Sequence, residues 1–269
     1  LVAELTAISG IFALLTNDDS TRFLVGISLS VGAFTMFYTT IASLPGSLVT
    51  DKFQGIVMAI LVIMLTLAVS LNPENKISRS EFDLASNWTT EGLTAAVTLI
   101  IAILSAELFN QGTWQRVWAA ESVTAMRRGF LIGSVMVFFL MTFFGVMGMI
   151  AYANDPESYD SGAKYSYLAF FDLLAPLSEG WQILTLILVV ALCASSVDTL
   201  QIGLSSIFSH DLVKIGWNPK WITRALIVAI NAPAIYLASK SFKVLELFLV
   251  ADLVCATSVF PVFCGLQTK

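Results

Sequence analysis

Long apolar segments alternate with short polar ones along the whole chain. A membrane span needs about 20 mostly apolar residues, and eight segments approach or reach that length. They cover residues 1–16, 23–44, 51–71, 92–110, 129–153, 181–214, 221–238 and 244–266. Pro45-Gly46 predicts the end of the second span, whereas Pro233 and Pro261 lie inside later spans and predict bends. The pattern therefore predicts an all-α membrane protein with about eight transmembrane helices.

Composition supports this fold class and excludes others. Of the 269 residues, 57% are hydrophobic and 12% are charged, whereas soluble domains carry about 25% charged residues. The net charge of -5 is not that of a nucleic-acid-binding surface. Cys193, Cys255 and Cys264 all lie in apolar spans, so we expect neither a disulfide framework nor a zinc site. We expect no cofactor. The chain starts within an apolar stretch, so we expect it to be part of a longer protein.

Charges in the connecting segments predict the orientation in the membrane. Basic residues dominate the connections after the fourth and sixth spans, and acidic residues dominate residues 154–179 between the fifth and sixth. Because positively charged connections stay in the cytoplasm, we expect both ends of this chain to be cytoplasmic and the acidic segment to be outside. An Asn87-Trp88-Thr89 sequon also falls outside. These features favour the plasma membrane.

The sixth span carries a cluster of polar residues after a purely apolar beginning. Asp198 and Thr199 lie three and four residues after Ser195, so all three share one helix face with Ser206. An ionisable side chain inside a span indicates a site or an ion pathway, and converging oxygen atoms suit a hard cation such as sodium. Serines also occur at helix–helix contacts simply because they are small. For the cluster as a whole, we favour a site.

The end of the fourth span predicts a pocket for a small solute. Glu107, Gln111 and Trp114 recur at helical spacing, Asn110 lies one turn before Trp114, and Gly112 could loosen the helix. Polar groups beside an aromatic wall are typical of a small-molecule pocket. The alternative is that these residues pack or cap the span at the interface. We interpret the nearby Arg116 as an interfacial anchor.

Asp51 follows the predicted turn LPGSLVT and opens the third span. A carboxylate there would be stabilised by the helix dipole, and Thr50 could cap the helix. The functional alternative places Asp51 on the route by which an ion leaves.

Three segments together resemble the sodium:solute symporter family. They are YTTIASLPGSLVTDKFQ (38–54), FNQGTWQRVWAAES (109–122) and ASSVDTLQIGLSSIFSHDLVK (194–214). The resemblance implies a leucine-transporter-type inverted-repeat bundle in one transmembrane domain, here incomplete, with part of the first repeat in residues 1–72 and the second in 92–266. On this mapping the first two of ten core helices are missing.

The family pattern also implies binding residues. The hydroxyls of Ser195 and Ser196 would bind sodium together with the main-chain carbonyl of Leu192, and Asp198 and Asp51 would lie near the inner ion pathway. Residues 129–145 carry no lysine, which disfavours a sugar, and the segment from Asn110 to Arg116 is more similar to the branches that handle urea or small organic ions.

We therefore expect a secondary active transporter that couples sodium entry to uptake of a small polar solute by alternating access. Its partners would be the solute, sodium and the lipid bilayer, without nucleic acid, and the oligomeric state is open. Alternatives are a proton-coupled carrier that uses Asp198 or Asp51, a channel, or a non-transporting sensor. An intramembrane hydrolase would need a positioned base. The single histidine, His210, lies at a span's polar end, so we expect no enzyme and no catalytic residues.

Overall fold

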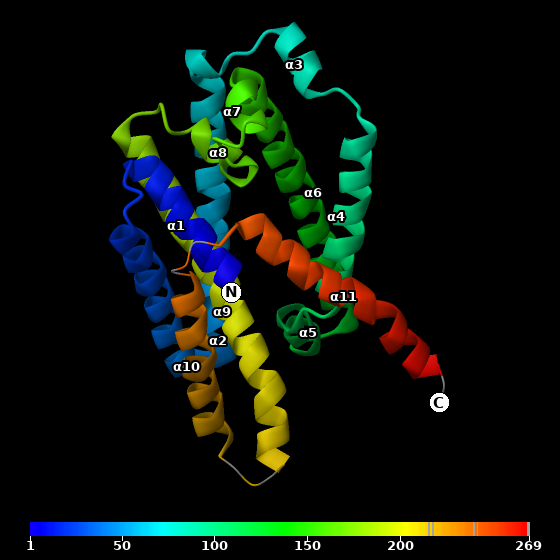
Figure 1. Cartoon of the computed structure of the whole chain (residues 1–269). Helices are drawn as coiled ribbons and strands as arrows, with labels where there is room; N and C mark the ends of the chain where they lie inside the picture. The colour runs from blue at the N-terminus through cyan, green and yellow to red at the C-terminus, as the bar shows by residue number, and fades with distance from the viewer. Residues whose placement is uncertain (215, 217, 239, 241, 268–269) are drawn as a thin grey trace.

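The computed structural model describes residues 1–214, 216, 218–238, 240 and 242–267. It is 86% helical, and the described part contains no strands. The side chain of His210, on which the hydrolase alternative depends, lies outside that part. Figure 1 shows helices packed side by side, with short helices gathered at one end. The all-α fold predicted from the sequence is confirmed.

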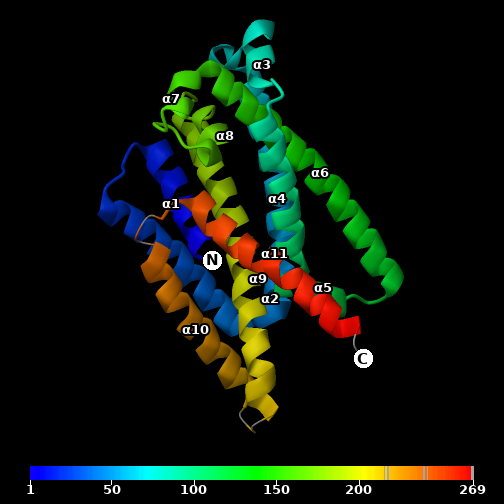
Figure 2. The same ribbon diagram turned by 45° about the vertical axis from the view of Figure 1, so that its right-hand side comes forward.

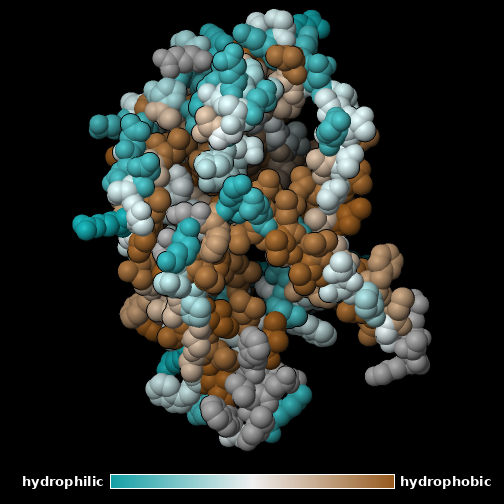
Figure 3. Space-filling view, viewed as in Figure 1, coloured by the Kyte–Doolittle hydropathy of each residue, from teal (hydrophilic) through white to brown (hydrophobic). Residues whose placement is uncertain are grey.

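Six segments of the described chain are long and apolar enough to cross a membrane. They are Thr21–Ile41, Leu44–Leu71, Thr90–Leu108, Val123–Asn154, Glu179–Ile207 and Val244–Leu266. Two shorter apolar helical segments, Val2–Thr16 and Arg224–Ala238, account for the other two predicted spans. Figure 3 shows a broad apolar zone below a hydrophilic upper end, as expected for a protein surrounded by lipid. We therefore treat the chain as an integral membrane protein.

The second and third predicted spans form one helix, α2 (Thr21–Leu71), which contains Pro45. The helix thus continues through Pro45-Gly46, although the two candidate spans, Thr21–Ile41 and Leu44–Leu71, still divide close to this point. A proline inside a helix lacks an N–H and crowds the carbonyl four residues earlier, so it bends a helix where neighbouring groups allow it to continue. Figures 1 and 2 both show α2 turning sharply, with one limb descending beside α1 (Val2–Thr16) and the other returning behind α9 (Glu179–Lys214). The two limbs correspond to the two predicted spans.

Four helices form the main packed group: α1 (Val2–Thr16), α2, α9 (Glu179–Lys214) and α10 (Pro219–Ala238). The buried side chains of one core cluster come mainly from α1, α9 and α10, among them Leu5, Ile8, Val197 and Ile235. A second cluster joins the end of α2 to α6 (Val123–Asn154), α8 (Ala169–Asp172) and the start of α9. Because α9 contributes to both clusters, it is the central helix of the fold.

The remaining long helices lie at the side of this group. Helix α4 (Thr90–Leu108) contacts α11 (Val244–Gln267), and α6 (Val123–Asn154) meets the packed group chiefly near its C-terminal end. Pro261 lies inside α11 and Pro233 inside α10, so neither proline ends its helix. Between α4 and α6, the short helix α5 (Gln111–Trp118) packs against α9.

Short helices cover the end of the molecule that carries the acidic segment. They are η1 (Pro73–Asn75), α3 (Arg79–Ala85), α7 (Pro156–Asp160), η2 (Ser166–Leu168) and α8 (Ala169–Asp172). Ala169 and Phe170 of α8 are buried, so this short helix packs against the rest of the molecule.

Two glycines on the first limb of α2 provide a test of this packing. A Cβ at Gly32 would lie 2.7 Å from Cγ1 of Ile235 on α10, whereas a Cβ at Gly26 would meet no described atom within 4 Å. Gly32→Ala should lower the free energy of unfolding in detergent by about 1–3 kcal/mol because the contact is overpacked. Gly26→Ala should be neutral or stabilising because alanine favours a helix. Equal thermal unfolding midpoints for the two variants would contradict the packing of α2 against α10.

Candidate functional site

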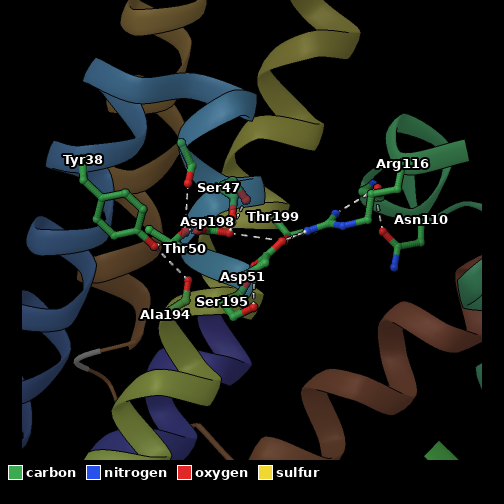
Figure 4. Close-up of polar contacts among 12 residues, drawn as sticks. Tyr38, Ser47, Thr50, Asp51, Asn110, Arg116, Ala194, Ser195, Asp198 and Thr199 are labelled. Carbon is green, nitrogen blue, oxygen red and sulfur yellow. Dashed lines mark hydrogen bonds and ion pairs between the residues drawn. The ribbon is translucent and has the colours of Figure 1, made fainter. Parts of the chain in front are cut away.

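The polar turn in the middle of α9 is the centre of a hydrogen-bonded network. Asp198 is completely buried. Its carboxylate accepts hydrogen bonds from Tyr38 Oη at 2.8 Å, Ser47 Oγ at 3.0 Å and Thr199 Oγ1 at 3.2 Å (Figure 4). Tyr38 precedes Pro45 on α2 and Ser47 follows it. Asp198 is thus held by both limbs of α2.

Asp51 lies beside Asp198 in the same network. It accepts a hydrogen bond from Ser195 Oγ at 2.8 Å and pairs with Arg116 Nη2 at 2.6 Å (Figure 4). Asp51 is inside α2 and not at a helix start, so its predicted role at a helix N-terminus was wrong. Thr50 does not cap a helix either, because its hydroxyl donates to the carbonyls of Gly46 and Ser47. Both corrections follow from the continuous helix through Pro45.

Arg116 belongs to this network. From the last turn of α5, its Nη2 also donates to Thr199 Oγ1 at 2.8 Å, and its Nη1 donates to the carbonyl of Gly112 at 3.1 Å. The sequence predicted only an interfacial anchor, and these contacts add a role in holding helices together. A guanidinium has five donors in a fixed plane, which allows Arg116 to join α2, α5 and α9 at one point.

A third carboxylate reaches the same region from α1. Ser196 Oγ donates to Glu4 Oε1 at 2.9 Å, and the Cys193 thiol lies 3.8 Å from the Glu4 carbonyl. The sequence analysis did not select Glu4, although an acidic residue in an apolar span is a signal of function. It was overlooked because the first apolar segment is short.

Formal charges in this region do not balance. Glu4, Asp51 and Asp198 supply three carboxylates, and Arg116 supplies one guanidinium. A charge in a low-dielectric interior is costly unless it is paired or neutralised. The arrangement can therefore accommodate a cation or protons. Among the described residues, no group of three or more His, Cys, Asp or Glu is placed to hold a metal ion, so a cation here would depend on hydroxyl and carbonyl oxygens as well.

The structure separates the two serines predicted to bind sodium. Ser195 faces Asp51 on α2, whereas Ser196 faces Glu4 on α1, because successive side chains on a helix point about 100° apart. Leu192 lies one turn earlier on α9, and its side chain is 42% exposed. Each serine thus lies next to a carboxylate, and their role as sodium ligands stays a prediction.

The residues predicted to line a solute pocket lie where α4 gives way to α5. Helix α4 ends at Leu108, and Asn110 caps α5 by accepting a hydrogen bond from the Gly112 amide at 3.0 Å. The predicted continuous helical face through Glu107, Gln111 and Trp114 was therefore wrong. The Asn110 amide could have revealed the break, because asparagine is a preferred N-cap.

The break nevertheless brings three of those four residues together. The Glu107 carboxylate accepts hydrogen bonds from Asn110 Nδ2 at 3.0 Å and from the Thr113 hydroxyl, and Trp114 Nε1 donates to the Leu108 carbonyl at 2.8 Å. Gln111 lies on the side of α5 that faces α9. Glu107 and Trp114 are both exposed, so they border an open region.

Small residues hold α5 close to α9. A Cβ at Gly112 would lie 2.3 Å from Thr199 Cγ2, and a Cβ at Gly203 would lie 3.2 Å from the Gly112 amide nitrogen. Gln115 Nε2 donates to Ser206 Oγ at 2.5 Å across the same contact. Gly112 thus permits close packing and is not the point at which the helix opens. Ser206, predicted on the polar face of α9, makes the contact to α5.

A second polar cluster joins α9 to α2 and α10. Gln201 donates to Asn231 Oδ1 at 2.6 Å and to Thr35 Oγ1 at 3.2 Å, and it accepts from Thr39 Oγ1 at 2.8 Å. All four side chains are fully buried. Because every polar group of the Gln201 amide has a partner, we assign this cluster to helix packing.

Comparison with known proteins provides one relative. No protein-family model matches the chain, and no solved structure matches it. The chain is 27% identical over 270 residues to the spermidine transporter DUR31 of Candida albicans, an alignment that covers 99% of this chain and 50% of the relative. The chain thus spans about half the length of that curated relative. This similarity and the membrane helices support a solute transporter.

The ion pair between α2 and α5 is testable by a double-mutant cycle with Asp51→Asn and Arg116→Gln. Each single change leaves a partly buried charge without its partner and should lower the unfolding midpoint in detergent. The double variant should be more stable than additivity predicts, with a coupling energy of roughly 0.5–3 kcal/mol.

The exposed pair Lys243–Glu246 is the matched control, since its atoms lie 3.1 Å apart with both side chains about 70% exposed. Its coupling should be near zero because solvent screens it. Strict additivity of the Asp51 and Arg116 changes would contradict the role of their pair.

Proposed function

We propose that the protein is a secondary active transporter that couples entry of sodium to uptake of a small solute. The observation that carries this proposal is the excess of carboxylates around the middle of α9, where, among the described residues, Glu4, Asp51 and Asp198 meet one guanidinium. Occupation by a cation would offset that charge. A transporter exploits such a site because the cation's electrochemical gradient drives its entry.

Sodium is the coupling ion in this proposal. Ser195, Ser196 and the Leu192 carbonyl would supply neutral oxygen ligands, and Asp51 and Asp198 would lie along the route toward one side of the membrane. The proton is the alternative, and a specific feature favours it: Asp198 receives three hydroxyl hydrogen bonds and no direct contact from a cationic side chain within the described residues. Protonation would neutralise it as effectively as sodium would.

The solute is a small organic cation of the alkylammonium class, with urea as the alternative. The similarity to a spermidine transporter supports the first class. The exposed Glu107 carboxylate could pair with an ammonium group, and the Trp114 ring could bind it by a cation–π contact. Interrupted helices are where membrane transporters bind their substrates, and the break between α4 and α5 exposes both side chains together with Asn110 and Gln111.

Helix α5 offers a direct route for coupling between the solute and the ion. Its eight residues are only about 12 Å long. One end carries Asn110 and Gln111 beside the proposed solute region, and the other end carries Arg116, which contacts Asp51 and Thr199. A solute that shifted α5 would change the affinity of the ion network for sodium. Sodium binding would then change the affinity for the solute by the same factor.

The proposal also includes the family and the placement of the chain. We infer membership of the sodium:solute symporter family, with residues 1–72 and 92–266 as parts of two inverted repeats. The acidic end would face the outside of the plasma membrane, and both ends of this chain would be cytoplasmic. The whole protein would alternate between states open to either side.

Uptake measurements on the full-length protein test this function. Cells or proteoliposomes containing it should accumulate labelled spermidine saturably when sodium is present outside, and much less when choline replaces sodium. Urea and proline serve as comparison solutes. Accumulation of urea in place of spermidine would change the proposed solute to urea and would support the transporter function. Uptake driven by an acid-outside gradient without sodium would replace sodium by the proton.

The sodium site is tested by Ser195→Ala, which removes one hydroxyl beside Asp51. The sodium concentration needed for half-maximal uptake should rise about tenfold, because one charge-assisted contact of 1–2 kcal/mol is lost. Ser205→Ala is the matched control, since the Ser205 hydroxyl donates only within its own helix, to the Ile202 carbonyl. Unchanged sodium activation in Ser195→Ala would remove Ser195 from the proposed site.

A further inference from the structure

Two cavities lie at the end of the molecule that carries the acidic segment. The larger, about 840 Å³, lies between α1, residues 162–172 and residues 242–246 at the start of α11. The smaller, about 580 Å³, lies between the C-terminal part of α6 and the same segment. Lys164, Tyr165 and Ser166 line both cavities, so the two cavities adjoin at this short stretch. Glu107 and Trp114 line neither.

The separating stretch places an alkylammonium group against an aromatic ring. Lys164 Nζ lies 2.9 Å from Asp155 Oδ2 and 5.8 Å from the centre of the Tyr159 ring. This combination of a carboxylate and a ring face is how proteins bind ammonium ligands. The Lys164 ammonium thus makes the same contacts, to a carboxylate and to a ring face, that an alkylammonium ligand would make.

The walls of both cavities extend the same chemistry. Four carboxylates line them, from Asp19, Asp160, Asp172 and Glu246. The cations in the two linings are Lys164 and Lys243, and each is already paired with a carboxylate.

Tyrosines supply the aromatic surface beside these acids. Tyr165 and Tyr167 stack with ring centres 5.7 Å apart, and Tyr152 and Tyr159 lie 6.2 Å apart. Tyr159 donates to Asp172 Oδ2 at 2.6 Å, and burial together with this carboxylate raises the pKa of Tyr159. It therefore stays a neutral phenol, whose ring face attracts cations.

We propose that the two cavities form an entry site for alkylammonium ligands and that Lys164 occupies part of it when no ligand is bound. This entry site is distinct from the proposed solute region at the α4–α5 break. The inference rests on the proposed function for its ligand class. A polyamine would displace the Lys164 ammonium from Tyr159 and bridge the two cavities. The site would collect cationic solutes at the acidic end before they move inward.

Protection of an introduced thiol tests occupancy without requiring transport. Ser166→Cys places a thiol at an exposed position that lines both cavities. Spermidine should slow its reaction with a maleimide in full-length protein in detergent, and urea should not. The unsubstituted full-length protein gives the background from its native cysteines, which include Cys193, Cys255 and Cys264.

Removal of the tethered cation provides the sharper comparison. In the Ser166→Cys background, Lys164→Met should lower the spermidine concentration for half-maximal protection by about two- to fivefold, since an exposed cation–π contact and ion pair are weak competitors. Lys76→Met is the matched control, because Lys76 is exposed at the same end, lines neither cavity and removes the same charge.

Absence of protection by spermidine, or equal shifts with Lys164→Met and Lys76→Met, would overturn the entry site. Glu107→Gln distinguishes the entry site from the proposed solute region at the α4–α5 break. With this change, uptake should fall while protection of Cys at position 166 stays unchanged. Protection by spermidine in protein whose Glu107 is intact and which takes up no spermidine would support the entry site and reject the transport function. Uptake without protection would do the reverse.

Discussion

Carboxylates inside a membrane protein must be neutralised, and the arrangement of α1, α2, α5 and α9 depends on that requirement. Asp51, Asp198 and Glu4 come from three helices and meet within about one turn of α9, at Ser195, Ser196 and Asp198. The partners that satisfy them are mostly hydroxyl groups, which donate hydrogen bonds without adding charge. Arg116 is the exception, and it comes from a helix of only eight residues. The region is therefore fully hydrogen-bonded yet remains electrically incomplete.

Close approach of backbones makes this gathering of polar groups possible. Van der Waals packing and hydrogen bonds hold membrane helices together, because lipid removes the usual hydrophobic drive between them. Gly112 and Gly203 let α5 lie against α9, which brings the Arg116 guanidinium within reach of Thr199 and Asp51. The fully paired cluster around Gln201, one turn along α9 from Asp198, fixes α9 to α2 and α10. One turn of α9 thus carries the unbalanced charge, and the next turn is held in place by paired polar groups.

Much of the fold could be predicted from the sequence because span length and apolar content are set by the bilayer. All eight predicted spans are helical, and the shared face of Ser195, Asp198 and Thr199 follows from helical spacing alone. The bend at Pro45 could not be predicted in the same way. Whether a proline ends a helix or bends it depends on neighbouring groups from distant parts of the chain. The same limit applies to Arg116, whose partners are 65 and 83 residues away, and its position near a span's end suggested lipid headgroups instead.

The angle of the bend in α2 determines which hydrogen bonds Asp198 can accept. Tyr38 and Ser47 lie on opposite sides of Pro45, and both donate to the same carboxylate. Straightening or sharpening the bend would move these two donors relative to each other, so Asp198 can keep both hydrogen bonds over only a narrow range of angles. A proton or ion that took the place of one donor would therefore release one limb of α2 from Asp198. The hydrogen bonding of one buried carboxylate and the angle between two membrane spans therefore change together.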